Sequence, residues 1–101
     1  MNEYSLQTPE KVSTTLAERF RELRLVKGWK QSTLADRSGV SLGSLRRFES
    51  TGQVSLQNLL KLAFALNRLD DFGRVFEAPP ARSIAELEAL DKKTTRQRGR
   101  I

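Results

Sequence analysis

Two adjacent arginines, Arg46 and Arg47, lie in a short helical pattern that follows another one beginning at Lys30 and Gln31. Guanidinium, ammonium and amide groups donate hydrogen bonds to phosphate oxygens and to base edges, so these side chains suit nucleic acid. The chain contains no His and no Cys, which excludes an imidazole base, a thiol nucleophile, a disulfide and an ordinary zinc site. The remaining Ser, Lys and Asp residues form no recognised catalytic motif. The residue types therefore predict a binding protein, without a metal or cofactor, and not an enzyme.

The positive charge of the chain is unevenly distributed. The net charge is +6 over 101 residues. Residues 19–47 hold eight basic and two acidic residues, residues 69–91 hold two basic and six acidic residues, and residues 92–101 hold five basic residues and no acidic one. Such segregation is typical of a phosphate-binding surface, but it is also found on ordinary solvated faces, so charge alone leaves both interpretations open.

The patterns that position these side chains are helical throughout. Thr8 followed by Pro9 predicts the start of a helix, because a threonine caps the first turn and proline fits its first position. Apolar residues at helical spacing continue this helix until Gly28 ends it. Four further helices are expected at residues 31–38, 42–50, 56–66 and 69–76. After Pro79-Pro80, a capping box at residues 83–86 predicts a short sixth helix that ends near residue 92.

These elements predict a single domain with flanking segments. We expect a flexible N-terminus at residues 1–7, the helical domain at 8–77, a linker with the short helix at 78–91, and a basic, disordered tail at 92–101. The longest uninterrupted apolar run has five residues, 62–66, which is far too short to span a membrane. The N-terminus has no apolar signal-peptide region, so we expect a cytoplasmic, nucleoid-associated protein.

The tight turn at residues 39–41 has a geometric consequence. It joins two short helices at a steep angle, the arrangement of a DNA-binding helix-turn-helix. Inward positions on the two helices carry Leu34, Ala35, Leu45 and Phe48. The opposite face of the second helix then presents Leu42, Gly43, Arg46 and Arg47. These are the residues that we expect to be able to enter a major groove.

The motif as a whole resembles a known family. Its residues are Gln31-x-x-Leu34-Ala35-x-x-x-Gly39-Val40-Ser41, then Leu45-x-x-Phe48-Glu49-x-x-Gly52 and an apolar helix. This combination resembles the Xre family, the Cro/CI-type helix-turn-helix regulators, over about residues 9–76. The resemblance implies an all-α, five-helix, lambda-repressor-like domain, here with a short C-terminal helical extension and a basic tail. The stretch from residue 46 to the arginine-rich end is similar to HipB-like antitoxins.

The resemblance also implies a set of DNA-contacting residues at the start of the two helices: Gln31, Ser41, Leu42, Gly43, Ser44, Arg46 and Arg47. Lys30 departs from the family pattern, which has a Ser or Thr cap at this position, but it adds a positive charge near DNA, and we expect it to hold a phosphate. In that family pattern Gln31 holds a phosphate, Leu42, Gly43 and Arg47 face base edges, and Ser44 and Arg46 lie at the phosphate flanks. Gly43 has no side chain to hydrogen-bond a base, so specificity would depend on Arg47, on contact of Leu42 with a thymine methyl group and on DNA shape. The resemblance pairs Arg24 with Glu49 as a structural ion pair. Ordinary solvated surface stays an alternative for the two arginines and for Gln31.

The function implied is that of a sequence-specific transcriptional repressor that binds double-stranded DNA as a homodimer on a pseudo-palindromic operator. The apolar residues of segment 69–76 could form the dimer contact, although core packing explains them equally well. A HipB-like antitoxin would in addition repress its own operon and bind a HipA-like kinase toxin. Two alternatives stay open: a solitary phage-type or metabolic regulator, and a protein-interaction module that binds no operator.

The basic tail generates a prediction of its own. If residues 92–101 contact DNA, their deletion lowers operator affinity and also the slope of log affinity against log salt, by about 0.9 for each lost phosphate contact. If the tail contacts a protein partner, both quantities stay unchanged and partner binding weakens. We expect the first result, because the arginines alternate with small or polar residues and no aromatic anchor accompanies them. Titrations of the full chain and of the truncated chain at several salt concentrations distinguish the two.

Overall fold

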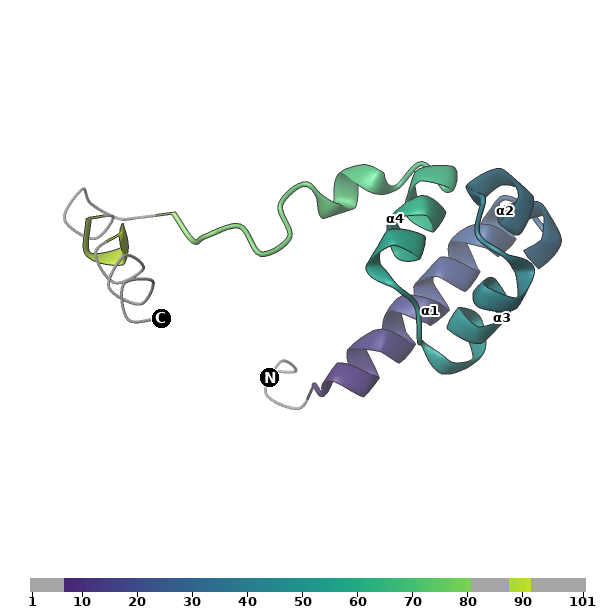
Figure 1. Ribbon diagram of the computed structural model, residues 1–101, viewed down its shortest axis with the longest axis horizontal. Helices are drawn as coiled ribbons and strands as arrows, with labels where there is room; N and C mark the ends of the chain where they lie inside the picture. Colours follow the sequence, from purple (N-terminus) through teal and green to yellow (C-terminus); the bar gives the residue numbers. More distant parts are fainter. Residues whose placement is uncertain (1–6, 81–87, 92–101) are drawn as a thin grey trace.

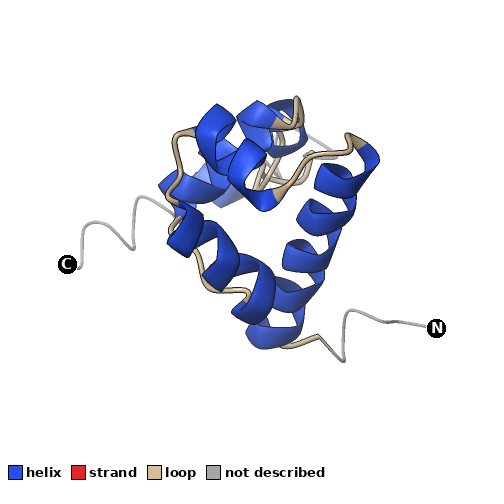
Figure 2. Ribbon diagram, turned by 90° about the vertical axis from the view of Figure 1, so that its right-hand side faces the viewer, coloured by secondary structure: helices blue, strands red, loops and turns tan. Residues whose placement is uncertain are grey.

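The computed structural model describes residues 7–80 and 88–91. Within residues 7–80, four α-helices and one 3₁₀ turn follow one another: α1 (Pro9–Val26), α2 (Gln31–Ser38), α3 (Leu42–Thr51), α4 (Leu56–Ala65) and η2 (Leu69–Phe72). No strand occurs within the described residues, as the blue helices and tan loops of Figure 2 show. The expected all-α fold is therefore confirmed.

Serine and threonine residues begin three of the four α-helices. The side chains of Thr8, Ser41 and Ser55 each accept a hydrogen bond from the backbone N–H three residues further on, at the start of α1, α3 and α4. Each of these bonds satisfies one N–H group that the first helical turn leaves without a partner. Lys30, at the start of α2, makes no such bond.

Glycines at the ends of α1, α2 and α3 adopt a left-handed backbone conformation, and two of them, Gly39 and Gly52, shape the helix-turn-helix region. Gly39 ends α2 with φ of 77°, which turns the chain directly into α3. Gly52 ends α3 with φ of 79° and lies against α1, where an added Cβ would come within 3.0 Å of the backbone carbon of Ser13. Glycine is needed at both positions for its conformation, and at Gly52 also for the close approach of α1.

The apolar core lies where α1, α2, α3 and α4 meet (Figure 1). α1 packs on α3, and α2 packs on both α3 and α4. The buried apolar side chains are Ala17, Phe20, Leu34, Ala35, Val40, Leu45, Phe48, Leu62, Ala63 and Leu66. The rings of Phe20 and Phe48 meet edge to face, with their centroids 5.5 Å apart. The four inward positions expected on α2 and α3 are thus all buried.

A buried polar network joins three parts of the chain next to this core. Arg24 of α1 donates from Nε and Nη2 to the two carboxylate oxygens of Glu49 in α3, both at 2.8 Å. Its Nη1 donates to the carbonyl oxygen of Trp29, in the loop before α2, at 2.9 Å. The side chains of Arg24 and Glu49 are only 8% and 5% exposed, so this is a buried, bidentate ion pair. It fixes α1 against α3 and against the entry to α2.

The fifth helix differs from the expectation. The helix expected at residues 69–76 is instead the 3₁₀ turn η2 over Leu69–Phe72, followed by turns as far as Phe76. Gly73 directly after η2 disfavours a longer helix, and Phe76 has a positive φ of 60°, which an α-helix cannot contain. Only Phe72 of this segment packs against the core, and Val75 and Phe76 are exposed.

The ends of the chain are described only in part. Residues 88–91 are helical, which agrees with the last part of the expected sixth helix, whereas its capping box at 83–86 lies outside the described residues. The expectations for a flexible N-terminus at 1–7 and a disordered tail at 92–101 also fall outside them, apart from Gln7.

The buried ion pair predicts a large difference between two glutamate variants. Glu49→Ala leaves the Arg24 guanidinium buried without its carboxylate, so we expect the free energy of unfolding to fall by about 3–5 kcal/mol. Glu77→Ala is the matched control, because Glu77 pairs with Arg74 at 3.2 Å on the surface, where both side chains are more than half exposed. Its loss changes stability by less than about 1 kcal/mol. Chemical denaturation measures both, and equal stabilities of the two variants would contradict this account.

Candidate nucleic-acid interface

One face of α3 is turned away from the core. Leu45 and Phe48 are buried under the helix, and Gly43, Arg46 and Arg47 are exposed on it. The pattern follows from the helical repeat, since residues 45 and 48 share one side and residues 43, 46 and 47 share the other. The structure therefore brings the two arginines onto the outer face of the second helix of the helix-turn-helix. α2 lies directly before it, with Lys30 and Gln31 at its start.

The two serines at the start of α3 bond to each other. Ser41 Oγ accepts from the backbone N–H of Ser44 at 3.1 Å and donates to Ser44 Oγ at 2.8 Å. The Ser41 hydroxyl thus caps the helix, and the half-buried Ser44 accepts its hydrogen bond. Ser41 is exposed beside the expected base-contacting residues, but its first role is to hold the end of α3 in place.

Leu42 is less accessible than the family pattern implies. It is half-buried and packs against the core, so only part of its side chain lies at the surface. Gly43 next to it has open space around the position of an added Cβ. The first turn of α3 therefore exposes the backbone at Gly43 and part of the Leu42 side chain. The charged groups of this face, Arg46 and Arg47, lie on the next turn.

Gln31 is tied into the buried ion pair. Its amide Nε2 donates to Glu49 Oε1 at 3.0 Å, and the residue is half-buried at the first position of α2. One carboxylate thus orients both Arg24 and Gln31. A side-chain cap is missing at the start of α2, where an anion would be favoured by the helix dipole and by free N–H groups. Lys30 is exposed at the same place.

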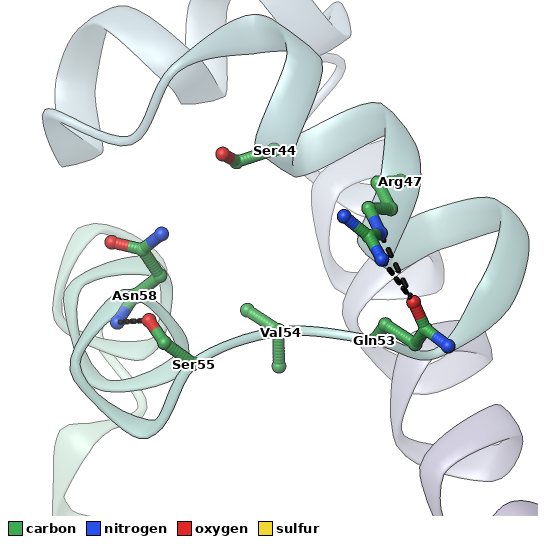
Figure 3. Close-up of a pocket in the computed structure, with 6 residues that line it drawn as sticks. All are labelled: Ser44, Arg47, Gln53, Val54, Ser55 and Asn58. Carbon is green, nitrogen blue, oxygen red and sulfur yellow. Dashed lines mark hydrogen bonds between the residues drawn. The ribbon is translucent and has the colours of Figure 1, made fainter.

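Arg46 and Arg47 differ in their surroundings although both are exposed. Within the described residues, the side chain of Arg46 makes no hydrogen bond or ion pair. Arg47 donates from Nε at 3.0 Å and from Nη2 at 2.6 Å to a single acceptor, the side-chain oxygen of Gln53 (Figure 3). Gln53 belongs to the loop between α3 and α4, so this bond connects the outer face of α3 to the chain that follows it.

A hollow of about 280 Å³ lies beside Arg47. Its walls are Ser44 and Arg47 from α3, Gln53, Val54 and Ser55 from the loop, and Asn58 from α4. Figure 3 shows the α3 residues on one side and Ser55 with Asn58 on the other, with Val54 between them. Gln53 and Asn58 are not expected from the sequence, because no motif marks them and only the folding of the loop brings them next to Arg47.

Other kinds of site are not seen in the part of the chain that the structure describes. Residues 7–80 and 88–91 contain no group of three or more acidic residues placed to hold a metal ion. None of the described helices is long and apolar enough to cross a membrane.

Comparison with known protein families agrees with this geometry. A family model described as helix-turn-helix, HTH_3, matches residues 20–72, which is more than half of the chain. No curated protein and no solved structure matches. The matched range begins within α1, contains α2, α3, the turn between them and α4, and ends with η2. The chain belongs to the HTH_3 family, the Cro/CI-type (Xre) helix-turn-helix domains of DNA-binding transcriptional regulators.

Proposed function

We propose that this protein is a sequence-specific repressor that inserts α3 into the major groove of its operator. The observation that carries the proposal is that Arg46 and Arg47 are exposed on the outer face of α3. Leu45 and Phe48 hold the inner face of the same helix against the core. An arginine that enters the major groove can donate two hydrogen bonds to O6 and N7 of guanine. We assign this base contact to Arg47 and a phosphate contact to Arg46, which has no partner within the described residues.

The start of α2 is assigned to the phosphate backbone. Gln31 is anchored by Glu49, and Lys30 adds a positive charge at a helix N-terminus whose N–H groups favour an anion. Ser41, Leu42, Gly43 and Ser44 form the first turn of α3 and its cap, where backbone and small side chains can approach the DNA closely. Contacts to phosphate position the domain, and Arg47 supplies the sequence preference.

We further propose that the repressor acts as a homodimer on a pseudo-palindrome. One such domain presents a single recognition helix, and family geometry places two of them in successive major grooves. Large apolar side chains remain exposed on α4 and in the segment after it: Phe64, Leu69, Val75 and Phe76. Exposed apolar side chains concentrated in one segment favour a protein contact. The chain after α4 extends away from α3 in Figure 1, so a second copy bound there would leave the groove-facing surface open.

A more specific proposal is that the repressor is the antitoxin of a HipBA-like operon. It is supported by the similarity of residues 46–76, with the arginine-rich end, to HipB-like antitoxins. In that role the chain would bind a HipA-like kinase toxin and repress the operon that encodes both. A solitary phage-type or metabolic regulator is the alternative.

Operator selection from random double-stranded DNA tests the repressor proposal. We expect a pseudo-palindrome with half-sites about one helical turn apart and a symmetric footprint from two protomers. Arg47→Ala should remove about 1–3 kcal/mol of discrimination at one base pair per half-site and leave non-specific binding nearly intact. Arg19→Ala is the matched control, since Arg19 is an exposed arginine of α1, outside α2 and α3 and outside the segment proposed for the dimer contact. A chain that selects no sequence would refute the proposal and favour a protein-interaction module.

Co-expression with the product of the neighbouring reading frame tests the antitoxin proposal. If that frame encodes a kinase-like toxin, we expect the two chains to co-purify and the complex to protect the promoter of the same operon. Binding of the operator at another locus, with no toxin partner, would identify a solitary regulator instead.

A further inference from the structure

We infer that Gln53 is a specificity-determining residue that positions Arg47 for base recognition without contacting the base itself. The inference rests on the proposed function, in which Arg47 reads a guanine. It concerns a residue outside the helix-turn-helix motif, in the loop between α3 and α4.

Gln53 holds the guanidinium of Arg47 on one side only. Arg47 Nε and Nη2 both donate to Gln53 Oε1, at 3.0 and 2.6 Å, so the acceptor occupies the side of the guanidinium plane formed by these two nitrogens. These are the only hydrogen bonds of the Arg47 side chain within the described residues. The opposite fork, formed by Nη1 and the second hydrogen of Nη2, keeps its donors. A fork of two parallel N–H groups is what O6 and N7 of guanine accept.

Gln53 is itself fixed to the turn of α3 that carries Arg47. Thr51 Oγ1 donates to the carbonyl oxygen of Arg47 at 2.6 Å and accepts from the backbone N–H of Gln53 at 3.1 Å. Gly52 between them is buried against α1 in a left-handed conformation. The backbone of Gln53 therefore has a defined place relative to the backbone of Arg47, and the side-chain bond closes a ring between the two residues.

Without its bond to Gln53, the Arg47 side chain has space for other rotamers. The hollow of about 280 Å³ beside it is bounded on the far side by Ser55 and Asn58, which offer polar groups (Figure 3). Without the bond to Gln53, the arginine would populate rotamers that point into this space. It would then lose conformational entropy when DNA fixes it in one rotamer, and this loss would weaken binding. Immobilising one such side chain weakens binding by about 2- to 10-fold. The amide of Gln53 is neutral, so it holds the guanidinium without reducing the attraction to phosphate.

Three variants of Gln53 separate positioning from other roles. Gln53→Met keeps the length of the side chain and removes the acceptor, so we expect discrimination at the base pair read by Arg47 to fall about 2- to 10-fold. Gln53→Glu keeps an acceptor, so discrimination should be retained, while overall affinity falls because a negative charge is added near DNA. In the Arg47→Ala background, Gln53→Met should have no further effect. Gln57→Ala, an exposed glutamine of α4 that does not line the hollow, is the control and should leave discrimination unchanged.

Competition binding compares the affinity of each variant for the selected operator and for the same operator with that one base pair substituted. Thermal unfolding checks that each variant is folded. Unchanged or increased discrimination in Gln53→Met, with a selective wild-type protein, would overturn the inference and leave the proposed function intact. A further loss caused by Gln53→Met in the Arg47→Ala background would also overturn it, because Gln53 would then act on DNA by itself. A wild-type protein that selects no sequence would overturn the proposed function, and the inference with it.

Discussion

The carboxylate of Glu49 is the constraint on which the arrangement of the first three helices depends. It is 5% exposed and accepts hydrogen bonds from Arg24 in α1 and from Gln31 at the start of α2. A buried charge that loses its partner is costly, so the three side chains stabilise one another only when the three helices are correctly placed. Among the described residues, no buried side-chain nitrogen or oxygen lacks a hydrogen-bond partner. The ion pair thus selects one relative position of α1, α2 and α3.

The apolar core and the turns act together with this ion pair. Phe48 lies one residue before Glu49, so α3 buries an aromatic ring and a charge side by side against α1. Gly52 permits the close approach of α1 at the end of the same helix, because any larger residue would meet the backbone of Ser13. With its inner side held at residues 45, 48, 49 and 52, α3 has little freedom to rotate. The orientation of its outer face follows from what is buried beneath it.

The charged groups on the outer face of α3 are the two arginines, and they differ in their hydrogen bonding. Arg46 has no partner within the described residues, which suits a phosphate contact that needs charge more than direction. Arg47 is bonded to Gln53, which suits a base contact that needs direction. Base recognition depends on the geometry of a planar fork, whereas attraction to phosphate acts over a Debye length and tolerates motion.

Local patterns and the helical repeat predict the helical class, the positions of α1, α2 and α3 to within a residue, and the cap of α1 by Thr8. They also predict the inward residues of α2 and α3. Local patterns also suggested a helix at 69–76, which the structure replaces with a short 3₁₀ turn. Packing between elements determines that Leu42 is half-buried, that Gln31 donates to Glu49, and that Gln53 holds Arg47. Each of these contacts joins side chains whose approach depends on how the helices and the loop after α3 pack, which no local pattern records.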